Sequence, residues 1–177
     1  YPTHALYGFT NFLLDLLKKQ QPQYIFCAFD ESLGTGFRHQ LCGDYKANRE
    51  LPDDALAFQL MACRQLCRVL GVTEMASTVY EADDLIGTLA KQAEKEGFQV
   101  FMVTPDKDFA QLVSENIFMY RPKSFGGGYE TWGIPEVQKK FEVERPEQVI
   151  DFLGMMGDSS DNIPGLPGVG EKTAKKF

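Results

Sequence analysis

Two short apolar runs constrain most strongly how this chain can fold. YIFCAF at 24–29 follows a proline and ends at Asp30, and QVFMVT at 99–104 ends just before Asp106. Apolar runs of this length, bounded by turn residues, are typical of strands buried on both faces of a parallel sheet. Asp30 and Asp106 are therefore expected just past the carboxyl ends of two strands, where sites form in such sheets.

Helical patterns separate these runs. Apolar residues recur at helical spacing before Pro22, between Pro52 and Gly71, and between Glu81 and Gly97. Strands alternating with helices of this length predict an α/β layered fold with a mainly parallel central sheet. Further strands are expected near 72–78 and 117–121, a hairpin loop at Gly126–Gly128, and helices near 107–113, 135–141 and 146–157.

Composition and charge limit the function classes. The chain has 177 residues, enough to bury a core in one domain with an appendage. Its net charge of −7 argues against a protein that coats DNA nonspecifically. A nuclease remains compatible with this charge, because metal ions neutralise clustered carboxylates and a small basic surface can hold the substrate.

The cysteines indicate a reducing environment. The four of them form no CxxC pair, and only two histidines accompany them, which argues against a zinc site. Cys63 and Cys67 are four apart in a helical pattern and are expected to share its apolar face. Reduced thiols, with no signal peptide or long apolar run, predict a cytoplasmic protein.

Eight carboxylates lie in four short clusters. Each cluster has an ordinary interpretation, since acidic residues favour the first turn of a helix and aspartate is common in turns. If the fold brings the clusters together, each pair at ~4 Å and an effective dielectric of ~20 repels by ~4 kcal/mol, which divalent cations would relieve. The clusters are Asp30; Glu81, Asp83 and Asp84; Asp106 and Asp108; and Asp158 and Asp161.

All-oxygen ligands favour hard ions, so the combined pattern predicts a site for Mg²⁺ or Mn²⁺. Two such ions about 4 Å apart can activate a water molecule and stabilise the leaving oxygen of a phosphodiester. We therefore interpret the four clusters together as a site that cuts nucleic acid.

The segment at 37–49, FRHQLCGDYKANR, is either a solvated loop or a phosphate-binding element. In the second interpretation, Arg38, Lys46 and Arg49 contact phosphates near the cut, and Tyr45 stacks on a base. A lysine or arginine there could also stabilise the charge that develops during phosphoryl transfer.

A glycine-rich segment, GLPGVGEKTAKK at 165–176, follows the last acidic cluster. Gly165, Gly168 and Gly170 allow a tight turn and leave backbone N–H groups bare near a helix start, where anions are favoured. Lys172 and Lys175 add positive charge. The spacing does not match a P-loop, and we interpret it as a helix-hairpin-helix, with 147–156 as its first helix, that binds one DNA backbone.

DYKANR, EADD, TPDKD and MGDSSDNIPGLPGVGEKTA together resemble the 5′ nuclease domain of bacterial DNA polymerase I, within the flap endonuclease superfamily, or its free-standing paralogue. The resemblance covers essentially the whole chain. It implies a PIN-like core, a helical arch, a helix-hairpin-helix that often binds K⁺, and cleavage of 5′ flaps and 5′ ends that leaves a 5′-phosphate and a 3′-hydroxyl. Such enzymes act in replication and repair, including the removal of RNA primers.

The resemblance also assigns roles to residues. Lys46 and Arg49 match the arch positions that engage the scissile phosphate, and the three glycines match the hairpin. Asp84 would lie between the two metals or outside them. The first metal would be held or flanked by Asp30, Glu81 and Asp83, and the second held by Asp106, Asp108, Asp158 and Asp161.

One departure from the family concerns the amino terminus. The family opens with a strand ending in an aspartate that contributes to the first metal, whereas this chain begins after that strand. We expect residues 1–145 to form the catalytic domain without that strand, and residues 146–177 to form a helix-hairpin-helix cut short at its end. The chain as given is therefore expected to be weakly active or inactive, and restoring the missing segment should recover cleavage.

DNA with a 5′ flap or a branch is the expected partner, and the protein is expected to be a monomer that does not bind membranes. A polymerase domain could follow in the parent chain. Three alternatives remain open. They are a Toprim-like or phosphatase-like metal site, a non-catalytic module that binds branched DNA, and a PIN-type ribonuclease.

Overall fold

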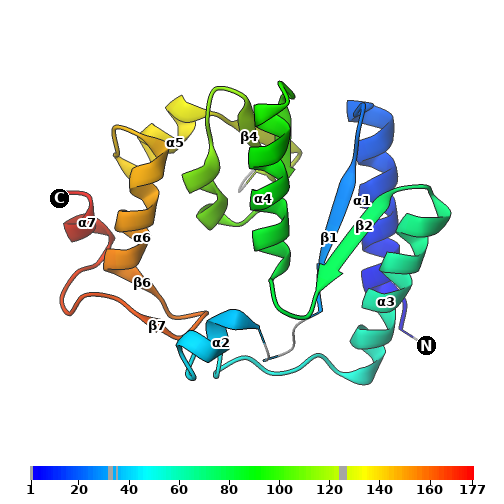
Figure 1. Ribbon diagram of the computed structural model, residues 1–177, viewed down its shortest axis with the longest axis horizontal. Coiled ribbons are helices and arrows are strands. Elements are labelled where there is room, and N and C mark those ends of the chain that lie inside the picture. The colour runs from blue at the N-terminus through cyan, green and yellow to red at the C-terminus, as the bar shows by residue number, and fades with distance from the viewer. Residues whose placement is uncertain (1, 32–33, 35, 124–126) are drawn as a thin grey trace. The chain divides into compact units, whose positions relative to one another are not determined.

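The computed structural model describes residues 2–31, 34, 36–123 and 127–177 (Figure 1). Backbone contacts divide the chain into two compact units. One contains Tyr1–Leu41 and Arg49–Ala82, and the other contains Cys42–Asn48 and Asp83–Phe177.

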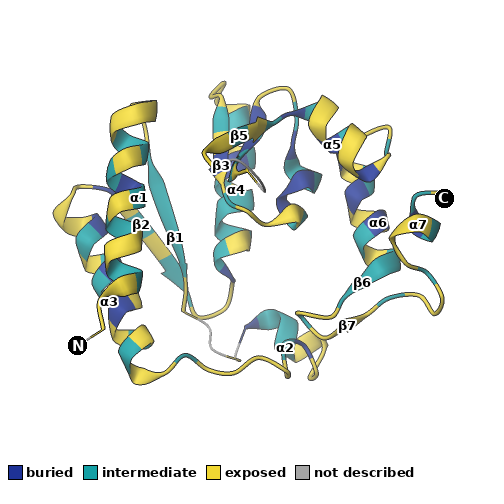
Figure 2. Ribbon diagram, turned by 180° about the vertical axis from the view of Figure 1, so that it is seen from behind, coloured by how far each residue is buried: buried dark blue, intermediate teal, exposed yellow. Residues whose placement is uncertain are grey.

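In the first unit, two helices pack on a parallel pair of strands. β1 (Phe26–Asp30) pairs with β2 (Thr73–Ser77), with Asp30 opposite Ser77 at the carboxyl end. Helices α1 (His4–Gln20) and α3 (Asp54–Val69) pack against each other, and a shorter α2 (Phe37–Leu41) follows the first strand. Leu13, Cys67 and Val72 are buried and form the centre of this core. Buried segments are dark blue in Figure 2.

Side chains accept hydrogen bonds from backbone N–H groups at the starts of α1 and α3. Asp53 precedes α3 and accepts a hydrogen bond from the Leu56 N–H at 2.7 Å. The buried Gln59 accepts from the backbone N–H of Ala5 at 2.9 Å and of Leu6 at 3.3 Å, so α3 caps the start of α1. Since the first N–H groups of a helix have no partner within it, this glutamine fixes how α1 lies on α3.

In the second unit, the sheet has the order β3-β4-β5. β3 (Val100–Val103) runs parallel to β4 (Ile117–Pro122), which is antiparallel to β5 (Tyr129–Trp132). Most of α4 (Ala82–Lys95) belongs to this unit, and the 3₁₀ helix η1 (Lys107–Leu112) follows β3. Met102, Ile117 and Met119 are among the buried residues of its core.

The carboxyl-terminal part of this unit is helical with one tight reversal. α5 (Ile134–Phe141), the 3₁₀ turn η2 (Pro146–Gln148) and α6 (Val149–Met156) come first. The two-residue strands β6 (Gly157–Asp158) and β7 (Ile163–Pro164) then pair around an acidic turn, and α7 (Glu171–Ala174) follows. A methyl group added at Gly165 would overlap the backbone of Met156, so only glycine fits where the chain returns past α6.

The α/β fold and the parallel pairing predicted from the sequence are confirmed, as are the buried positions of Cys63 and Cys67. The helix predicted near 107–113 is a 3₁₀ helix, and the Asp106 side chain caps its start. The sequence pattern did not predict α2 or the β6–β7 pair. Gly126, in the predicted hairpin loop, lies outside the described residues.

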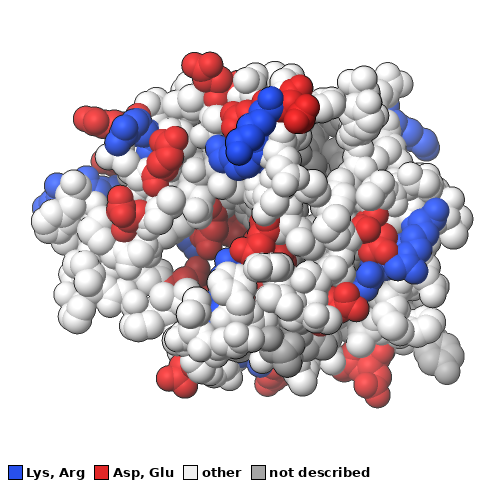
Figure 3. Space-filling view, viewed as in Figure 1, with Lys and Arg blue, Asp and Glu red and all other residues white. Residues whose placement is uncertain are grey.

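Acidic and basic side chains are interspersed over the face seen in Figure 3, on a chain whose net charge is −7. Within the described ranges, every helix is too short or too polar to cross a membrane.

Candidate active site

The acidic cluster of the second unit starts at the carboxyl end of β3. Thr104 and Pro105 lead from the strand to Asp106, whose Oδ1 accepts a hydrogen bond from the Asp108 N–H at 3.0 Å. Aspartate commonly closes such a turn on the backbone two residues further on. The turn starts η1 and places Asp106, Lys107 and Asp108 together where the strand ends.

Lys107 joins this turn to the acidic turn between β6 and β7. Its Nζ lies 2.9 Å from Asp158 Oδ2 and 3.6 Å from Asp108 Oδ1. Its charge also interacts with that of Asp106. Residues about fifty positions apart in the sequence therefore meet around one ammonium group, and the cluster of Asp106, Asp108 and Asp158 exists in the folded unit.

The pKa values in this cluster move in opposite directions. Burial raises the pKa of Asp108, and the charge of Asp106 adds to the rise. Hydrogen bonds from Ser160 and Lys107 hold the pKa of Asp158 far below its usual value. Burial opposes the charged form of Lys107, but its hydrogen bond to Asp158 and the nearby carboxylates raise its pKa overall. Such opposed shifts are common at functional sites.

The donor set suits a hard divalent cation, because it consists of carboxylate oxygens. Asp108 Oδ1 is buried and accepts no hydrogen bond, so it has unused capacity as a ligand. In the described part of the chain, no three acidic, histidine or cysteine side chains already enclose a metal-sized space, and Lys107 supplies the positive charge among them. Asp106, Asp108 and Asp158 would hold the ion, which would supply a polarised water molecule and neutralise phosphate charge.

Residues 42–48 of the predicted phosphate-binding segment pack on the acidic turn of the same unit. The Lys46 N–H donates to the Asp161 carbonyl at 2.9 Å, and the Asn48 and Asn162 amides donate to the carbonyls of Ser159 and Asp44. Lys46 has φ 54°, in the left-handed region that non-glycine residues rarely adopt. Such backbone strain persists only where the surroundings impose it, and here these three hydrogen bonds hold the segment in place.

This packing gives Asp161 and Tyr45 partners that the sequence did not predict. The Asp161 carboxylate lies 3.9 Å from Lys46 Nζ and 3.4 Å from the Tyr45 hydroxyl, whereas Asp158 faces Lys107. Tyr45 is only 6% exposed, and Lys46 Nζ lies 4.9 Å from the centre of its ring. The ring therefore offers little surface for a base in this structure, and its stacking role stays a prediction.

The remaining acidic residues belong to the start of α4 and the end of β1. Asp30 Oδ1 accepts a hydrogen bond from the Ala82 N–H at 2.7 Å, so it satisfies the first turn of that helix. Glu81 is nearly buried and lies 3.8 Å from the Arg38 guanidinium. Asp83 and Asp84 occupy the first helical turn, where acidic side chains complement the helix dipole. Arg49 is exposed in the segment before α3.

The glycine hairpin divides into structural and accessible positions. Gly168 has φ 79°, and Gly170 precedes α7, where its carbonyl accepts from the N–H groups of Thr173 and Ala174 at 2.9 Å. Lys175 pairs with Glu142 at 3.1 Å and Glu171 at 3.2 Å, while Lys172 is exposed. Lys172 is thus better placed than Lys175 to meet a ligand.

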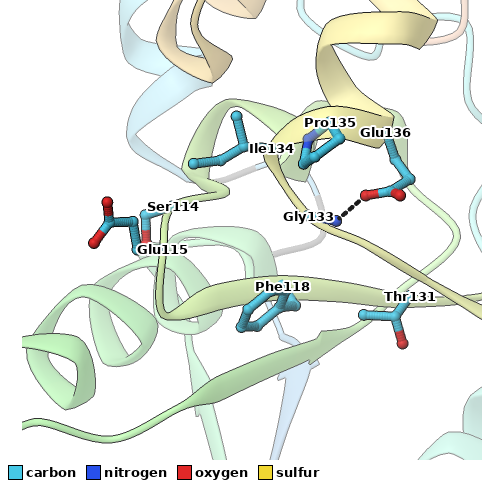
Figure 4. A pocket seen from close by; sticks show the side chains of 8 residues that line it. All are labelled: Ser114, Glu115, Phe118, Thr131, Gly133, Ile134, Pro135 and Glu136. Carbon is cyan, nitrogen blue, oxygen red and sulfur yellow. Dashed lines mark hydrogen bonds between the residues drawn. The ribbon is translucent and has the colours of Figure 1, made fainter.

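A hollow of about 370 Å³ lies elsewhere on this unit, next to β4 and β5 (Figure 4). Glu115 and Glu136 line it, and the Gly133 N–H donates to Glu136 at 2.9 Å (dashed line in Figure 4). None of the residues predicted for the site lines this hollow, and no lysine or arginine is among its lining residues, so we do not include it in the candidate active site.

The sequence reading missed three residues that build the site: Lys107, Asn48 and Asn162. Lys107 lies between two predicted metal ligands in the sequence, but its ion pair with Asp158 forms only because the fold brings together residues about fifty positions apart. The two asparagines act through backbone carbonyls of distant segments, and residue type alone carries no signal for such contacts.

Comparison with known proteins gives a consistent result along the whole chain. Residues 1–142 match the family model of the 5′-3′ exonuclease N-terminal resolvase-like domain, and residues 144–177 match that of the 5′-3′ exonuclease C-terminal SAM fold. DNA polymerase I of Mycobacterium tuberculosis is 46% identical over 176 residues, which are 99% of this chain and 19% of that protein.

Two further similarities extend this result. The 5′-3′ exonuclease of Aquifex aeolicus is 40% identical over 98% of this chain and 58% of its own length. The bacteriophage T5 flap endonuclease, solved in a pseudo-enzyme-product complex with DNA and metal ions, has a TM-score of 0.75 at 20% identity over 97% of this chain and 65% of that one. The chain therefore spans about a fifth of the polymerase relative and somewhat more than half of the exonuclease.

Proposed function

Because the chain belongs to the 5′-3′ exonuclease family, we propose that it is a metal-dependent, structure-specific 5′ nuclease. Its substrates would be 5′ flaps and 5′ ends of branched DNA, including RNA primers, and its products would carry a 5′-phosphate and a 3′-hydroxyl. The work would take place in the bacterial cytoplasm, during replication and repair. The protein would act as a monomer.

The meeting of Asp106, Asp108 and Asp158 around a single lysine is the observation that carries this proposal. One lysine cannot balance the charge of three carboxylates, and the buried Asp108 Oδ1 accepts no hydrogen bond, so the remaining repulsion opposes folding unless a divalent cation relieves it. The T5 flap endonuclease, with DNA and metal ions in its structure, has a similar fold.

We assign the roles as follows. Two Mg²⁺ or Mn²⁺ ions would be used, one held or flanked by Asp30, Glu81 and Asp83, and one held by Asp106, Asp108 and Asp158. Asp84 and Asp161 would act around these ions, with Asp161 positioning Lys46. Lys46 and Arg49 would engage the scissile phosphate. Residues 146–177 would hold duplex DNA through Gly165, Gly168, Gly170 and Lys172, with K⁺ at the hairpin.

The test is a Mg²⁺ and Mn²⁺ titration on a 5′-flap duplex, with the cut position mapped. Cleavage is measured with the 177-residue chain and its variants. Asp106→Asn and Asp158→Asn should lower cleavage at least a hundredfold while binding of the flap in Ca²⁺ stays nearly normal. Asp151→Asn, which neutralises an exposed carboxylate of α6 outside the cluster, is the matched control.

The other outcomes identify the alternatives. Structure-specific binding that EDTA does not change, without cleavage at any Mn²⁺ concentration, would indicate a non-catalytic binding module. Faster cleavage of RNA than of flapped DNA would indicate a ribonuclease, and supercoil relaxation or phosphomonoester hydrolysis would indicate a Toprim-like or phosphatase-like site. Equal loss of cleavage in Asp151→Asn would contradict the assignment of the cluster as the metal site.

A further inference from the structure

A basic pocket adjoins the acidic cluster, and three of its lining residues, Arg121, Trp132 and Lys140, have no role assigned so far. It has a volume of about 550 Å³ and lies wholly within the second unit. Pro105, Asp106 and Lys107 form one wall, and Arg121, Trp132 and Lys140 complete the lining. We propose that this pocket binds a nucleotide phosphate, a proposal that rests on the function proposed above because the pocket shares Asp106 with the cluster.

The charges that line the pocket favour an anion. Three cations, Lys107, Arg121 and Lys140, line the pocket with one carboxylate, Asp106. Lys107 is already paired with Asp158 and Asp108, and Arg121 lies 3.8 Å from Glu130, so Lys140 adds the positive charge that these pairs do not balance. Lys140 is exposed on α5 and makes no ion pair with any described residue, so its ammonium group is available to a ligand. Lysine and arginine side chains of this kind supply most contacts to phosphates in protein–DNA complexes.

Arg121 is held in place by its neighbours on the β4–β5 hairpin. Its guanidinium carbon lies 4.2 Å from the centre of the Trp132 ring, and its Nε lies 3.8 Å from Glu130 Oε1. Glu130 Oε1 in turn accepts a hydrogen bond from the Trp132 indole at 2.9 Å. The guanidinium is therefore oriented before any ligand arrives, which lowers the entropy lost on binding.

The hydrogen-bonding capacity of Arg121 is nevertheless unused. Its Nε is buried and has no hydrogen-bond partner, and the guanidinium makes no hydrogen bond with the described residues. A stabilising role for the hairpin would explain the stacking on Trp132, but not an unpaired donor in a pocket that a free lysine also lines. A phosphate would accept hydrogen bonds from the terminal N–H groups of the Arg121 guanidinium and from the Lys140 ammonium group at once.

The ligand can reach the pocket in two forms. One is a phosphodiester of a DNA strand that passes the acidic cluster, and the other is a free mononucleotide released from it. Both present the same phosphate, and they differ in the number of phosphates that contact the protein at once.

Trp132 provides the measurement, because it is the single tryptophan of the chain. Its fluorescence is followed in EDTA at low salt while inorganic phosphate, thymidine 5′-monophosphate or hexathymidylate is added. We expect a saturable change, with the hexamer binding more tightly than the monophosphate if a strand is the ligand, and about as tightly if a free nucleotide is. EDTA prevents cleavage, so the experiment measures binding alone. The protein could bind these ligands without being a nuclease, or be a nuclease that does not bind them in this pocket, so the two proposals can fail separately.

Three variants test the assignment. Lys140→Gln and Arg121→Gln should each weaken binding on the order of tenfold. If the hexamer binds, each should also reduce the slope of log affinity against log salt by about 0.7, the value for one phosphate contact on a single strand. Lys139→Gln, one position away on the exposed face of α5 and outside the pocket, should bind as the unaltered protein does.

Two results would overturn the proposal. One is the lack of a saturable fluorescence change with all three ligands. The other is equal weakening in Lys139→Gln and Lys140→Gln, which would indicate general attraction to a basic helix. Because Arg121→Gln also removes the stacking on Trp132, Lys140→Gln decides the question if the arginine variant is unstable.

Discussion

Lys107 is the residue on which the charge balance of the candidate site depends. It lies between Asp158 and Asp108 and interacts with Asp106, so its ammonium group offsets the repulsion among the three carboxylates. A bound divalent cation would perform the same task with twice the charge. The lysine and the ion should therefore be partly interchangeable in their effect on stability.

We expect Lys107→Met to lower the melting temperature of the metal-free protein by several degrees, since the carboxylates lose their internal cation. Added Mn²⁺ should then raise the melting temperature of this variant more than that of the unaltered protein. Scanning calorimetry with EDTA and with Mn²⁺ measures both changes. Lys91→Met, which removes an exposed lysine paired only with Glu94, is the control, and equal Mn²⁺ effects in the two variants would contradict the role of Lys107.

Glu74, in the first unit, is a charged residue with a structural role, because it pairs with two arginines. It accepts hydrogen bonds from Arg68 and Arg64, which lower its pKa below the ordinary value of 4.5. A carboxyl whose pKa is lower in the folded protein stabilises it above that ordinary value, and the stabilisation is lost as the pH falls through the folded pKa.

Glu74→Gln should therefore lower the melting temperature by ~2–4 °C at pH 7, for a loss of about 1 kcal/mol in a partly solvated ion pair. The difference from the unaltered protein should shrink as the pH falls below 4.5. Glu31→Gln removes a more exposed carboxylate with one contact to Arg64 at 3.5 Å and should have a smaller effect. A difference that stays constant down to pH 3 would show that the ion pair does not cause it.

At the scale of elements, the sequence predicted what depends on local pattern. The apolar runs became β1 and β3, and the acidic residue after each run lies at the carboxyl end of its strand. Elements that depend on distant partners were missed. β6 and β7 have two residues each, too few for any periodicity, and they exist because Gly157 and Gly165 let two chain segments approach.

The candidate site divides in the same way. Residue type and spacing identified the carboxylates, since hard cations need such oxygens in quantity. They could not show that Asp161 faces Lys46 while Asp158 faces Lys107, because that choice depends on the turn between β6 and β7. Nor could they show that Tyr45 is buried, since a tyrosine beside a lysine is equally compatible with a base-stacking loop.

The close approach of Gly165 to the backbone of Met156, in the hairpin after α6, allows a prediction about stability. Gly165→Ala should destabilise the protein by roughly 1–3 kcal/mol or more, because the added methyl group meets the Met156 backbone, which cannot move without disturbing α6. Gly154→Ala, within α6 and with open space around the added methyl group, should be neutral or stabilising by up to ~1 kcal/mol. Urea unfolding measures both changes.

Measuring duplex DNA binding by the same two variants shows whether the packing of the hairpin on α6 matters for binding as well as for stability. If the hairpin must be intact to hold DNA, binding should weaken in Gly165→Ala at a temperature where the protein is still folded, and not in Gly154→Ala. Unchanged stability in Gly165→Ala would show that the chain does not pass α6 as closely as the structure indicates.

For the whole molecule, the proposed function requires a chain with net charge −7 to bind a polyanion. At physiological salt the Debye length is about 8 Å, so the charges near the bound phosphates matter more than the total. The acidic cluster would then oppose DNA binding locally, and the proposed phosphate-binding pocket beside it would partly compensate for that repulsion.

Neutralising the cluster should therefore strengthen DNA binding without any change elsewhere. We expect Ca²⁺, added at constant ionic strength, to raise the affinity for a 5′-flap duplex severalfold over the affinity in EDTA. Asp158→Asn should bind more tightly than the unaltered protein in EDTA and gain less from Ca²⁺. Fluorescence anisotropy of a labelled flap measures each affinity.

Asp151→Asn distinguishes local from global charge, because it changes the net charge by the same single unit from an exposed position outside the cluster. Its affinity in EDTA should match that of the unaltered protein, and its gain from Ca²⁺ should be undiminished. If instead both variants bind more tightly by the same factor, the total charge controls binding, and the cluster has no special relation to the DNA. If neither does, the carboxylates lie away from the bound phosphates, and the proposed cleavage site would have to be sought elsewhere on the protein.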